Sequence, residues 1–320
     1  MPMIDMPLEE LRVYRGINPK PADFDAYWAA ALAELEATAP APEFLPAEFQ
    51  TPFAECFDLW FTGVGGARVY AKYLRPRHAK EVPHPAVLQF HGYSGSSGDW
   101  QDKLGLAALG FSVAALDVRG QGGRSQDPGG ALGNTLHGHI IRGLDDAPER
   151  LFYRSVFLDT VQLARVVMAL PEVDARRVGA MGMSQGGALT LACAALEPRI
   201  RRLAPMCPFL CDYRRVWEMD LARDAYEELR NWFRRFDPRH ERETEIFTRL
   251  GYVDCQHLAP RIQGEVLMAV GLMDEICPPS SQFAAYNRIT APKEMALFPD
   301  FAHEHYPGFM DQAFQFMAGL

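Results

Sequence analysis

The strongest constraint on the fold is a series of short, continuously apolar segments that alternate with helical stretches such as residues 156–170. The apolar segments cover residues 86–90, 111–116, 178–183, 203–206 and 266–270. A strand that is buried on both faces needs apolar side chains on both faces, so such segments are typical of a parallel sheet covered by helices. The sequence therefore predicts an α/β fold with a mostly parallel central sheet and helices on both of its faces.

Two segments depart from this alternation. About residues 1–50 contain a predicted helix that opens near residue 24 and ends near Pro40, with too little apolar surface for a separate domain. Residues 207–258 are charged and aromatic, and an insertion there would lie over the carboxyl side of the sheet as a cap. We expect residues 1–320 to form one domain with an N-terminal extension and a helical cap insertion.

A glycine-rich stretch at residues 63–66 lies between two alternating segments, residues 57–61 and 69–74. This arrangement predicts a β-hairpin. A dinucleotide-binding loop would need the third glycine of the G-x-G-x-x-G pattern and a helix after it. The sequence has neither. The glycines are therefore interpreted as a turn.

A G-x-S-x-G pentapeptide at residues 182–186 lies between an apolar segment and a helix-forming run at residues 188–192. In a nucleophile elbow, a serine occupies a strained turn between a strand and a helix. That turn accepts only small residues two positions before and after the serine. Ser184 is therefore the candidate nucleophile.

A serine hydroxyl needs a base, and the base needs an acid that orients it. In α/β-hydrolases the order along the chain is serine, acid, histidine, and the last two follow later strands. Asp274 follows the last apolar segment, and His303 follows a predicted strand at residues 295–298. Asp300 and His305 are alternatives that spacing alone leaves open.

Ester hydrolysis also needs donors for the developing oxyanion. These are normally the backbone N–H after the nucleophile and one from the loop after an early strand. Gln185 supplies the first position, and residues 91–95 leave an early apolar segment. We expect the backbone N–H of Tyr93 to be the second donor. The alternative for residues 91–95 is a glycine-rich turn without a catalytic role.

Composition excludes several classes of protein. The formal net charge is −9, and no stripe of Lys and Arg offers the field that nucleic acid requires. The six cysteines are scattered without CxxC pairs, so we expect reduced thiols instead of a disulfide framework. Residues 1–10 lack the features of a signal peptide, and no segment approaches the length of a membrane span. We therefore expect a soluble cytoplasmic protein.

Histidine pairs in the sequence do not predict a metal site. His137 and His139 lack the four-residue spacing of a helical ligand pair, and residues 303–305 fail the same test. We expect neither a metal nor an organic cofactor. The helix-spaced aromatic residues within 226–233 are interpreted as packing of the cap.

Three short motifs resemble the signature motifs of the acetyl xylan esterase and cephalosporin C deacetylase family, carbohydrate esterase family 7. They are Arg119-Gly120-Gln121, Gly182-Met183-Ser184-Gln185-Gly186 and His303-Glu304. Further segments similar to the family are residues 6–11, 18–25, 271–280 and 283–287, so the resemblance covers nearly the whole chain. One departure is His257, where the family pattern has Asn, and it lies outside the catalytic motifs.

The resemblance implies roles for single residues. It places Ser184, Asp274 and His303 at the triad positions and the backbone amides of Tyr93 and Gln185 at the oxyanion-hole positions. It thereby favours Asp274 over Asp300 and His303 over His305. Arg119, Gln121 and Glu304 would support the site. From their opposite charges, we expect Arg119 to pair with Glu304 and to hold the His303 loop.

The resemblance also implies the α/β-hydrolase fold. It implies a serine esterase that removes acetyl groups from acetylated xylo-oligosaccharides and similar small esters, including cephalosporin C, through an acyl-enzyme. It implies a ring-shaped homohexamer whose active sites face an interior chamber that excludes large polymers. Because the base must be neutral, activity should fall in acid through a pKa near about 6.5. The alternatives are a hydrolase of the same fold for longer acyl esters, thioesters or peptides, and a non-catalytic binding module.

Overall fold

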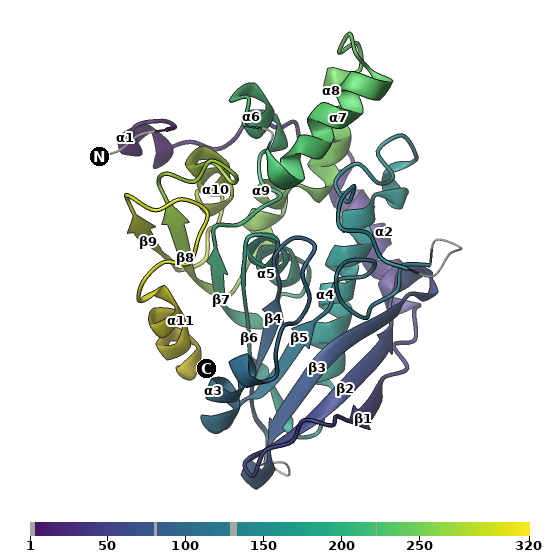
Figure 1. Cartoon of the computed structure of the whole chain (residues 1–320), viewed down its shortest axis with the longest axis vertical. Coiled ribbons are helices and arrows are strands. Elements are labelled where there is room, and N and C mark those ends of the chain that lie inside the picture. Colours follow the sequence, from purple (N-terminus) through teal and green to yellow (C-terminus); the bar gives the residue numbers. More distant parts are fainter. Residues whose placement is uncertain (1–3, 80–81, 129–132, 222) are drawn as a thin grey trace.

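A nine-stranded sheet forms the centre of the molecule (Figure 1). The computed structural model describes residues 4–79, 82–128, 133–221 and 223–320. The strand order is β1-β2-β3-β5-β4-β6-β7-β8-β9. The first three strands pair antiparallel with each other and with β5, and all later pairs are parallel. The bounds are β1 Glu43–Pro46, β2 Ala54–Thr62, β3 Arg68–Pro76, β4 His84–Phe90, β5 Ser112–Leu116, β6 Val173–Met183, β7 Ile200–Met206, β8 Glu265–Gly271 and β9 Lys293–Phe298.

The strands predicted from the sequence are present. Each of the five apolar segments falls within or overlaps one of the strands β4 to β8, and the predicted hairpin is the antiparallel pair of β2 and β3. Its turn contains Gly65 and Gly66 with φ angles of 69° and 78°, a backbone conformation that favours glycine. The interpretation of these glycines as a turn is therefore confirmed.

Helices cover both faces of the sheet, as predicted. Helices α4 and α5 lie on one face, with α2 packed on α4, and α3 and α11 lie on the other (Figure 1). Alternation along β4 shows the same division, since Leu88 packs into the core beneath α4 and α5 whereas Val87 packs into the core on the α3 side. The bounds are α1 Leu8–Leu11, α2 Phe24–Glu36, α3 Leu104–Ala108, α4 Phe152–Met168, α5 Gln185–Leu196, α10 Pro279–Tyr286 and α11 Phe309–Ala318. Within the described residues, no helix is long and apolar enough to cross a lipid bilayer.

Residues 207–258, here called the cap, form a helical segment beyond the carboxyl ends of the strands (Figure 1). Its helices are α6 Tyr213–Glu218, α7 Glu227–Phe236, α8 Glu243–Leu250 and α9 Cys255–Leu258. The buried carboxylate of Asp212 attaches the N-terminal segment to the base of the cap. It accepts hydrogen bonds from the Tyr14 hydroxyl at 2.8 Å and from the backbone N–H groups of Ile17 and Asn18 at 3.0 and 2.8 Å. The N-terminal segment also contributes the edge strand β1, which the sequence did not predict.

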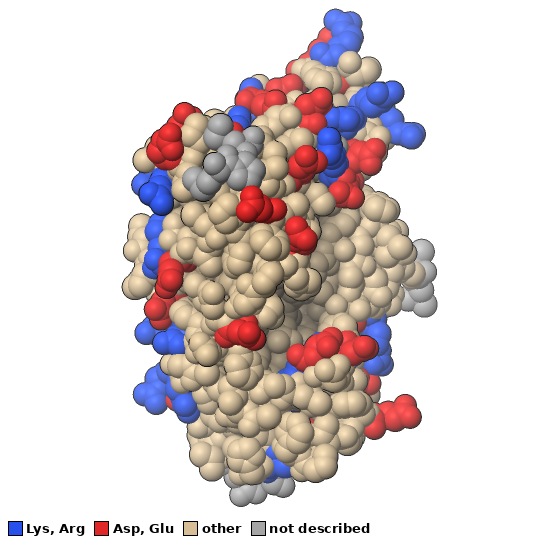
Figure 2. Space-filling model, turned by 60° about the vertical axis from the view of Figure 1, so that its left-hand side comes forward, with Lys and Arg blue, Asp and Glu red and all other residues tan. Residues whose placement is uncertain are grey.

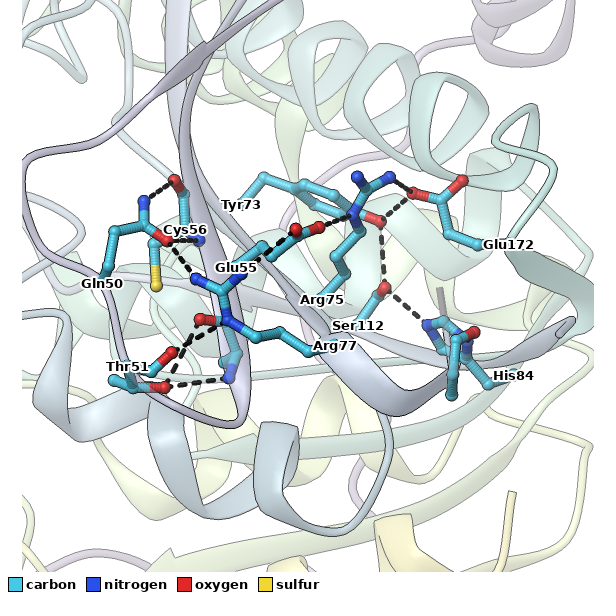
Figure 3. Close-up of polar contacts among 12 residues, drawn as sticks. Gln50, Thr51, Glu55, Cys56, Tyr73, Arg75, Arg77, His84, Ser112 and Glu172 are labelled. Atoms are coloured by element: carbon cyan, nitrogen blue, oxygen red, sulfur yellow. Dashed lines mark hydrogen bonds and ion pairs between the residues drawn. The ribbon is translucent and has the colours of Figure 1, made fainter. Parts of the chain in front are cut away.

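A chain of polar side chains joins the hairpin to the amino ends of the parallel strands (Figure 3). Glu172 is almost fully buried and accepts hydrogen bonds from the Tyr73 hydroxyl at 3.1 Å and from Arg75 Nη1 at 3.0 Å. The hydroxyl of Ser112 lies 2.9 Å from both Tyr73 Oη and His84 Nε2. These contacts hold β3 against β4 and β5 at the amino ends of the parallel strands, on the side of the sheet away from the cap.

Replacing Glu172 with alanine should lower the free energy of unfolding by about 1–3 kcal/mol, because it removes a buried acceptor from both Tyr73 and Arg75 and leaves them only Ser112 and Glu55. The esterase activity expected from the sequence should not change, since this network lies at the amino ends of the strands. Denaturant unfolding with parallel activity assays measures both quantities. Glu43→Ala is a control, because Glu43 is about half exposed in its pair with Arg68, and it should cost less than about 1 kcal/mol. Equal losses in the two variants would contradict the role of Glu172.

Candidate active site

Ser184 lies in a sharp turn between β6 and α5. Its φ and ψ angles are 57° and −117°, a conformation that is strained for a residue with a side chain. The two flanking glycines allow the turn, because a Cβ on Gly182 or Gly186 would collide with the carbonyl oxygen of Phe90. The strand–turn–helix context predicted for the pentapeptide is therefore present.

The structure brings Ser184, His303 and Asp274 together from three different strand ends. His303 Nε2 lies 2.9 Å from Ser184 Oγ, and His303 Nδ1 lies 2.8 Å from Asp274 Oδ2. Asp274 follows β8 and His303 follows β9, and the carboxyl ends of neighbouring parallel strands meet at one edge of the sheet. Asp300 and His305, the two alternatives, are exposed.

The carboxylate of Asp274 is fully buried and held in one orientation. Its Oδ1 accepts the backbone N–H groups of Ile276 and Cys277 at 2.9 and 2.8 Å, and its Oδ2 accepts Gln282 Nε2 at 3.2 Å as well as the imidazole. A carboxylate with this many donors remains an acceptor, so Nδ1 of His303 carries the proton. The other ring nitrogen can then accept a proton from the serine hydroxyl.

The surroundings of His303 raise the pKa of its imidazole. Burial lowers the pKa of the ring, whereas the neighbouring Cys277 sulfur and the hydrogen bond to Asp274 raise it, and the raising contributions prevail. Burial also raises the pKa of the Cys277 thiol to about 12, so this sulfur remains protonated at neutral pH. The Asp274 carboxylate is therefore the neighbour that favours the imidazolium at neutral pH.

Gln121 ties the elbow to the loop that follows β4. Its side-chain amide forms a reciprocal pair with that of Gln185, with distances of 2.8 and 2.9 Å, and Tyr153 Oη donates to Gln185 Oε1 at 2.9 Å. Gln121 Oε1 also accepts the backbone N–H of Ser94 at 3.2 Å. In the described parts of the chain, the backbone N–H groups of Tyr93 and Gln185 donate no hydrogen bond to a backbone carbonyl outside regular secondary structure.

The expected pairing of Arg119 with Glu304 is wrong. Arg119 is 2% exposed and forms two hydrogen bonds of 2.6 Å with Asp159 of α4, which is 1% exposed. The guanidinium also donates to the carbonyl oxygen of Val64 at 3.2 Å. Glu304 is exposed and accepts the backbone N–H of Ala302 at 3.1 Å. Arg119 thus joins α4 to the hairpin turn, and Glu304 acts within its own loop.

The histidines at residues 137–139 and at 303–305, for which the sequence predicts no metal site, lie in different parts of the structure. His139 stacks on Phe152 with its ring centre at 4.9 Å, and its Nε2 lies 3.2 Å from the carbonyl oxygen of Thr135, so it faces the protein interior. Cys207, Asp274 and His303 each offer one possible ligand atom within 4.8 Å of the others. A metal ion bound there would occupy the histidine that contacts Ser184.

All six cysteines are buried and have free thiols.

A cavity of about 690 Å³ opens beside Ser184 and His303. Most of its lining is apolar, and Tyr93, His137 and Asp224 add polar groups at its wall. A volume of this order accommodates a small organic ligand. On the face shown in Figure 2, the central part is mostly uncharged apart from several Asp and Glu, and Lys and Arg lie mainly toward the margins. Both features favour an uncharged small molecule over a polyanion.

A model of the acetyl xylan esterase family matches residues 1–320. The chain belongs to the acetyl xylan esterase family. Acetyl xylan esterase 1 from Thermoanaerobacterium sp. JW/SL YS485 is 59% identical, with a TM-score of 0.95 over 98% of this chain and 99% of that chain. An acetyl xylan esterase from Paenibacillus sp. R4 is 34% identical, with a TM-score of 0.92 over 98% and 99% of the two chains.

A curated relative is longer than this chain. Acetyl esterase Axe7A from Xylanibacter ruminicola is 26% identical over 293 residues, which are 89% of this chain and 64% of that protein. The chain therefore spans less than two thirds of the length of this relative. Membership of the acetyl xylan esterase family confirms the family predicted from the motifs, and the two solved structures confirm the predicted α/β-hydrolase fold.

The sequence did not predict several residues of the site in this member of the acetyl xylan esterase family. Asp159 lies on α4, forty residues from Arg119, and no pattern connects the two. Glu228 lies on the cap helix α7, where a glutamate normally faces solvent, but it is buried and contacts Tyr93. Cys207 follows β7 and approaches His303, and no sequence motif indicates it.

Asp159→Asn should destabilise the protein by about 3–5 kcal/mol, because it leaves the buried Arg119 charge with only the more distant carboxylate of Asp127, at 3.7 Å. Glu304→Gln should change both stability and turnover little, because the Glu304 side chain is exposed. Denaturant unfolding of the two variants beside the wild type measures the difference. A large loss of stability in Glu304→Gln, with none in Asp159→Asn, would restore the pairing expected from the sequence.

Proposed function

We propose that the protein is a serine esterase that removes acetyl groups from acetylated xylo-oligosaccharides and similar small esters through an acyl-enzyme. The observation that carries the proposal is the hydrogen-bonded chain from Ser184 Oγ through His303 to Asp274. Membership of the acetyl xylan esterase family supports the acetyl group and the sugar. The cavity of about 690 Å³ beside Ser184 supports a small substrate.

In the first half of the reaction, neutral His303 takes the proton of Ser184 as the hydroxyl attacks the acetyl carbonyl. Asp274 fixes the tautomer of His303 and stabilises the imidazolium that forms. The backbone N–H groups of Tyr93 and Gln185 donate to the oxyanion, which needs donors that have no other acceptor. His303 then protonates the departing sugar alcohol, and the acetyl group remains on Ser184.

In the second half, His303 takes a proton from a water molecule that attacks the acetylated serine. The same two amides stabilise the second oxyanion, and acetate leaves as Ser184 recovers its proton. Gln121 supports both halves, since its side chain holds Gln185 and the backbone N–H of Ser94 in place. Each step uses only the side chains and amides of this chain and a water molecule.

Cephalosporin C, a hexameric assembly and a cytoplasmic location are further parts of the proposal. They are supported by the resemblance of the motifs to carbohydrate esterase family 7, in which small acetyl esters enter a chamber inside a ring. Six free, buried thiols are compatible with a reducing compartment. In a closed ring, chamber size and not the cavity itself would exclude long polymers.

Hydrolysis of esters with acyl chains of increasing length tests the assignment. In the proposed function the sugar occupies the open part of the cavity, and only an acetyl group occupies the acyl site. The value of kcat/KM should therefore be highest for 4-nitrophenyl acetate and fall steeply for the butyrate and octanoate. Acetylated xylo-oligosaccharides should be deacetylated. Ser184→Ala should lose activity by about 10⁴-fold or more, whereas Ser96→Ala, outside the catalytic cavity, serves as the matched control. A preference for octanoate, or full activity of Ser184→Ala, would contradict the proposal.

The pH dependence tests the role of His303. The pKa of its imidazole is raised, so the ring is already protonated, and unable to act as a base, at pH values where free histidine would be neutral. Activity should therefore fall as the pH decreases, with the midpoint of kcat/KM above about 6.5. Steady-state kinetics between about pH 5 and 9 measure this midpoint, and the unfolding temperature at each pH shows where the protein remains folded. A rate that does not change between about pH 5 and 8 would rule out His303 as the base.

A further inference from the structure

We propose that Glu228, on the cap helix α7, is a positioning residue for the oxyanion hole. It holds the hydroxyl of Tyr93, the residue whose backbone amide donates to the oxyanion in the proposed mechanism. The inference rests on the proposed function and extends it from the catalytic residues to the cap. It gives the cap a part in catalysis besides covering the cavity.

The carboxylate of Glu228 joins three parts of the chain that are far apart in sequence. It accepts a hydrogen bond from the hydroxyl of Tyr93. It also accepts the backbone N–H groups of Gly138 and Ile140 at 2.7 and 2.8 Å. One side chain of the cap therefore fixes both the loop after β4 and the loop around residue 139, and these two loops form a wall of the catalytic cavity.

Glu228 is a buried acid that depends on these donors. Glu228 is 6% exposed, and its hydrogen-bond partners among the described residues are the Tyr93 hydroxyl and the backbone N–H groups of Gly138 and Ile140. Burial raises the pKa of Glu228, while the backbone donors, first that of Gly138, lower it, and the result is a raised pKa. Because hydrogen bonds alone compensate the buried carboxylate, the bond from Tyr93 is an essential one, and charge-assisted bonds of this kind are strong.

The ring of Tyr93 is also fixed by its neighbours. Phe209 and His139 contact it edge-on, with ring centres 5.8 and 5.3 Å away. On the side of the sheet, Gln121 Oε1 accepts the backbone N–H of Ser94, the next residue. The loop is therefore held from the sheet by Gln121 and from the cap by Glu228, and the amide of Tyr93 belongs to the residue that Glu228 holds.

Such an arrangement matters because oxyanion stabilisation depends steeply on the position of the donor. Removal of one donor costs about 10²–10³-fold in kcat, and small displacements of catalytic groups are also costly. Loss of the Glu228 contact would leave the Tyr93 amide in the chain but free to move. We therefore expect a smaller effect than removal of a donor, and expect it in kcat more than in KM.

Tyr93→Phe and Glu228→Gln test the inference with 4-nitrophenyl acetate as substrate. Tyr93→Phe keeps the backbone amide and the ring contacts and removes only the hydroxyl. Each variant should lower kcat about tenfold, with KM within about twofold of the wild type. In the double variant the loss should be smaller than the product of the two single losses, because both substitutions perturb the contact between Glu228 and Tyr93. The melting temperature is measured for every variant, and Tyr93→Phe keeps the test valid if Glu228→Gln folds poorly.

Trp232→Phe is the matched control. Trp232 lies on the same helix, and its Nε1 donates to Asp145 Oδ2 at 3.0 Å, so it also attaches α7 to the rest of the chain. Among the described residues, the aromatic and cationic partners of its ring are Phe233, Phe236 and Arg242, which all belong to the cap. This variant should keep the kcat of the wild type even if its melting temperature falls. A separation of kcat from stability distinguishes positioning from a merely structural role.

Unchanged kcat in Tyr93→Phe, a change in KM alone, or an equal loss of kcat in Trp232→Phe would overturn the inference. Different results would contradict the proposed function. These are a wild type that does not hydrolyse acetyl esters and a Ser184→Ala variant that remains active. An active wild type with an inactive Ser184→Ala thus establishes the background in which the Glu228 contact is judged.

Discussion

The strained turn at Ser184 is the constraint on which the rest of the site depends. The conformation, with φ of 57°, persists because contacts on both sides determine it. The backbone N–H of Ser184 donates to the carbonyl oxygen of Met206 at 2.9 Å, and its own carbonyl oxygen accepts Ala188 and Phe209 at 3.0 Å. The turn thereby fixes β6, α5, β7 and the first residues of the cap in one arrangement, and the serine hydroxyl faces His303.

Polar contacts stabilise both ends of the sheet, and the proposed chemistry lies at one of them. The polar chain around Glu172 holds the amino ends of the strands (Figure 3), whereas the carboxyl ends carry the strained turn and the proposed triad. At the carboxyl edge, each of the proposed catalytic groups has a second contact that orients it. Asp274 is held by backbone amides, Gln185 by Gln121, and Tyr93 by Glu228. The site is therefore a network that includes the cap.

Much of the fold could be predicted from the sequence, because a strand buried on both faces leaves a continuous apolar segment. The edge strand β1 leaves no such pattern, since three of its four residues are exposed. The positions of Ser184, Asp274 and His303 could be predicted, because the α/β-hydrolase fold sets the order of the three residues along the chain and places each after a strand. The partner of Arg119 could not, because opposite charges in two separate motifs do not reveal which side chains are buried together, and the true partner Asp159 lies on α4.

Glu228 illustrates the same limit for the cap. A glutamate beside other charged residues on a helix resembles a solvent-exposed position, and only the fold shows that it is buried against Tyr93. Local patterns therefore predicted the elements and the reactive side chains, whereas the contacts that orient those side chains depend on tertiary packing. These orienting contacts distinguish a serine that merely occupies a turn from one that is proposed to react.

The central claim is that Ser184 is the nucleophile of an acetyl esterase. Its most direct test is to label the protein with an organophosphate, follow the loss of activity on an acetyl ester, and locate the label by peptide mapping. The account predicts one label per chain, on Ser184, with activity lost in proportion to labelling. Full activity after Ser184 is completely labelled, or inactivation with the label on another residue, would contradict it.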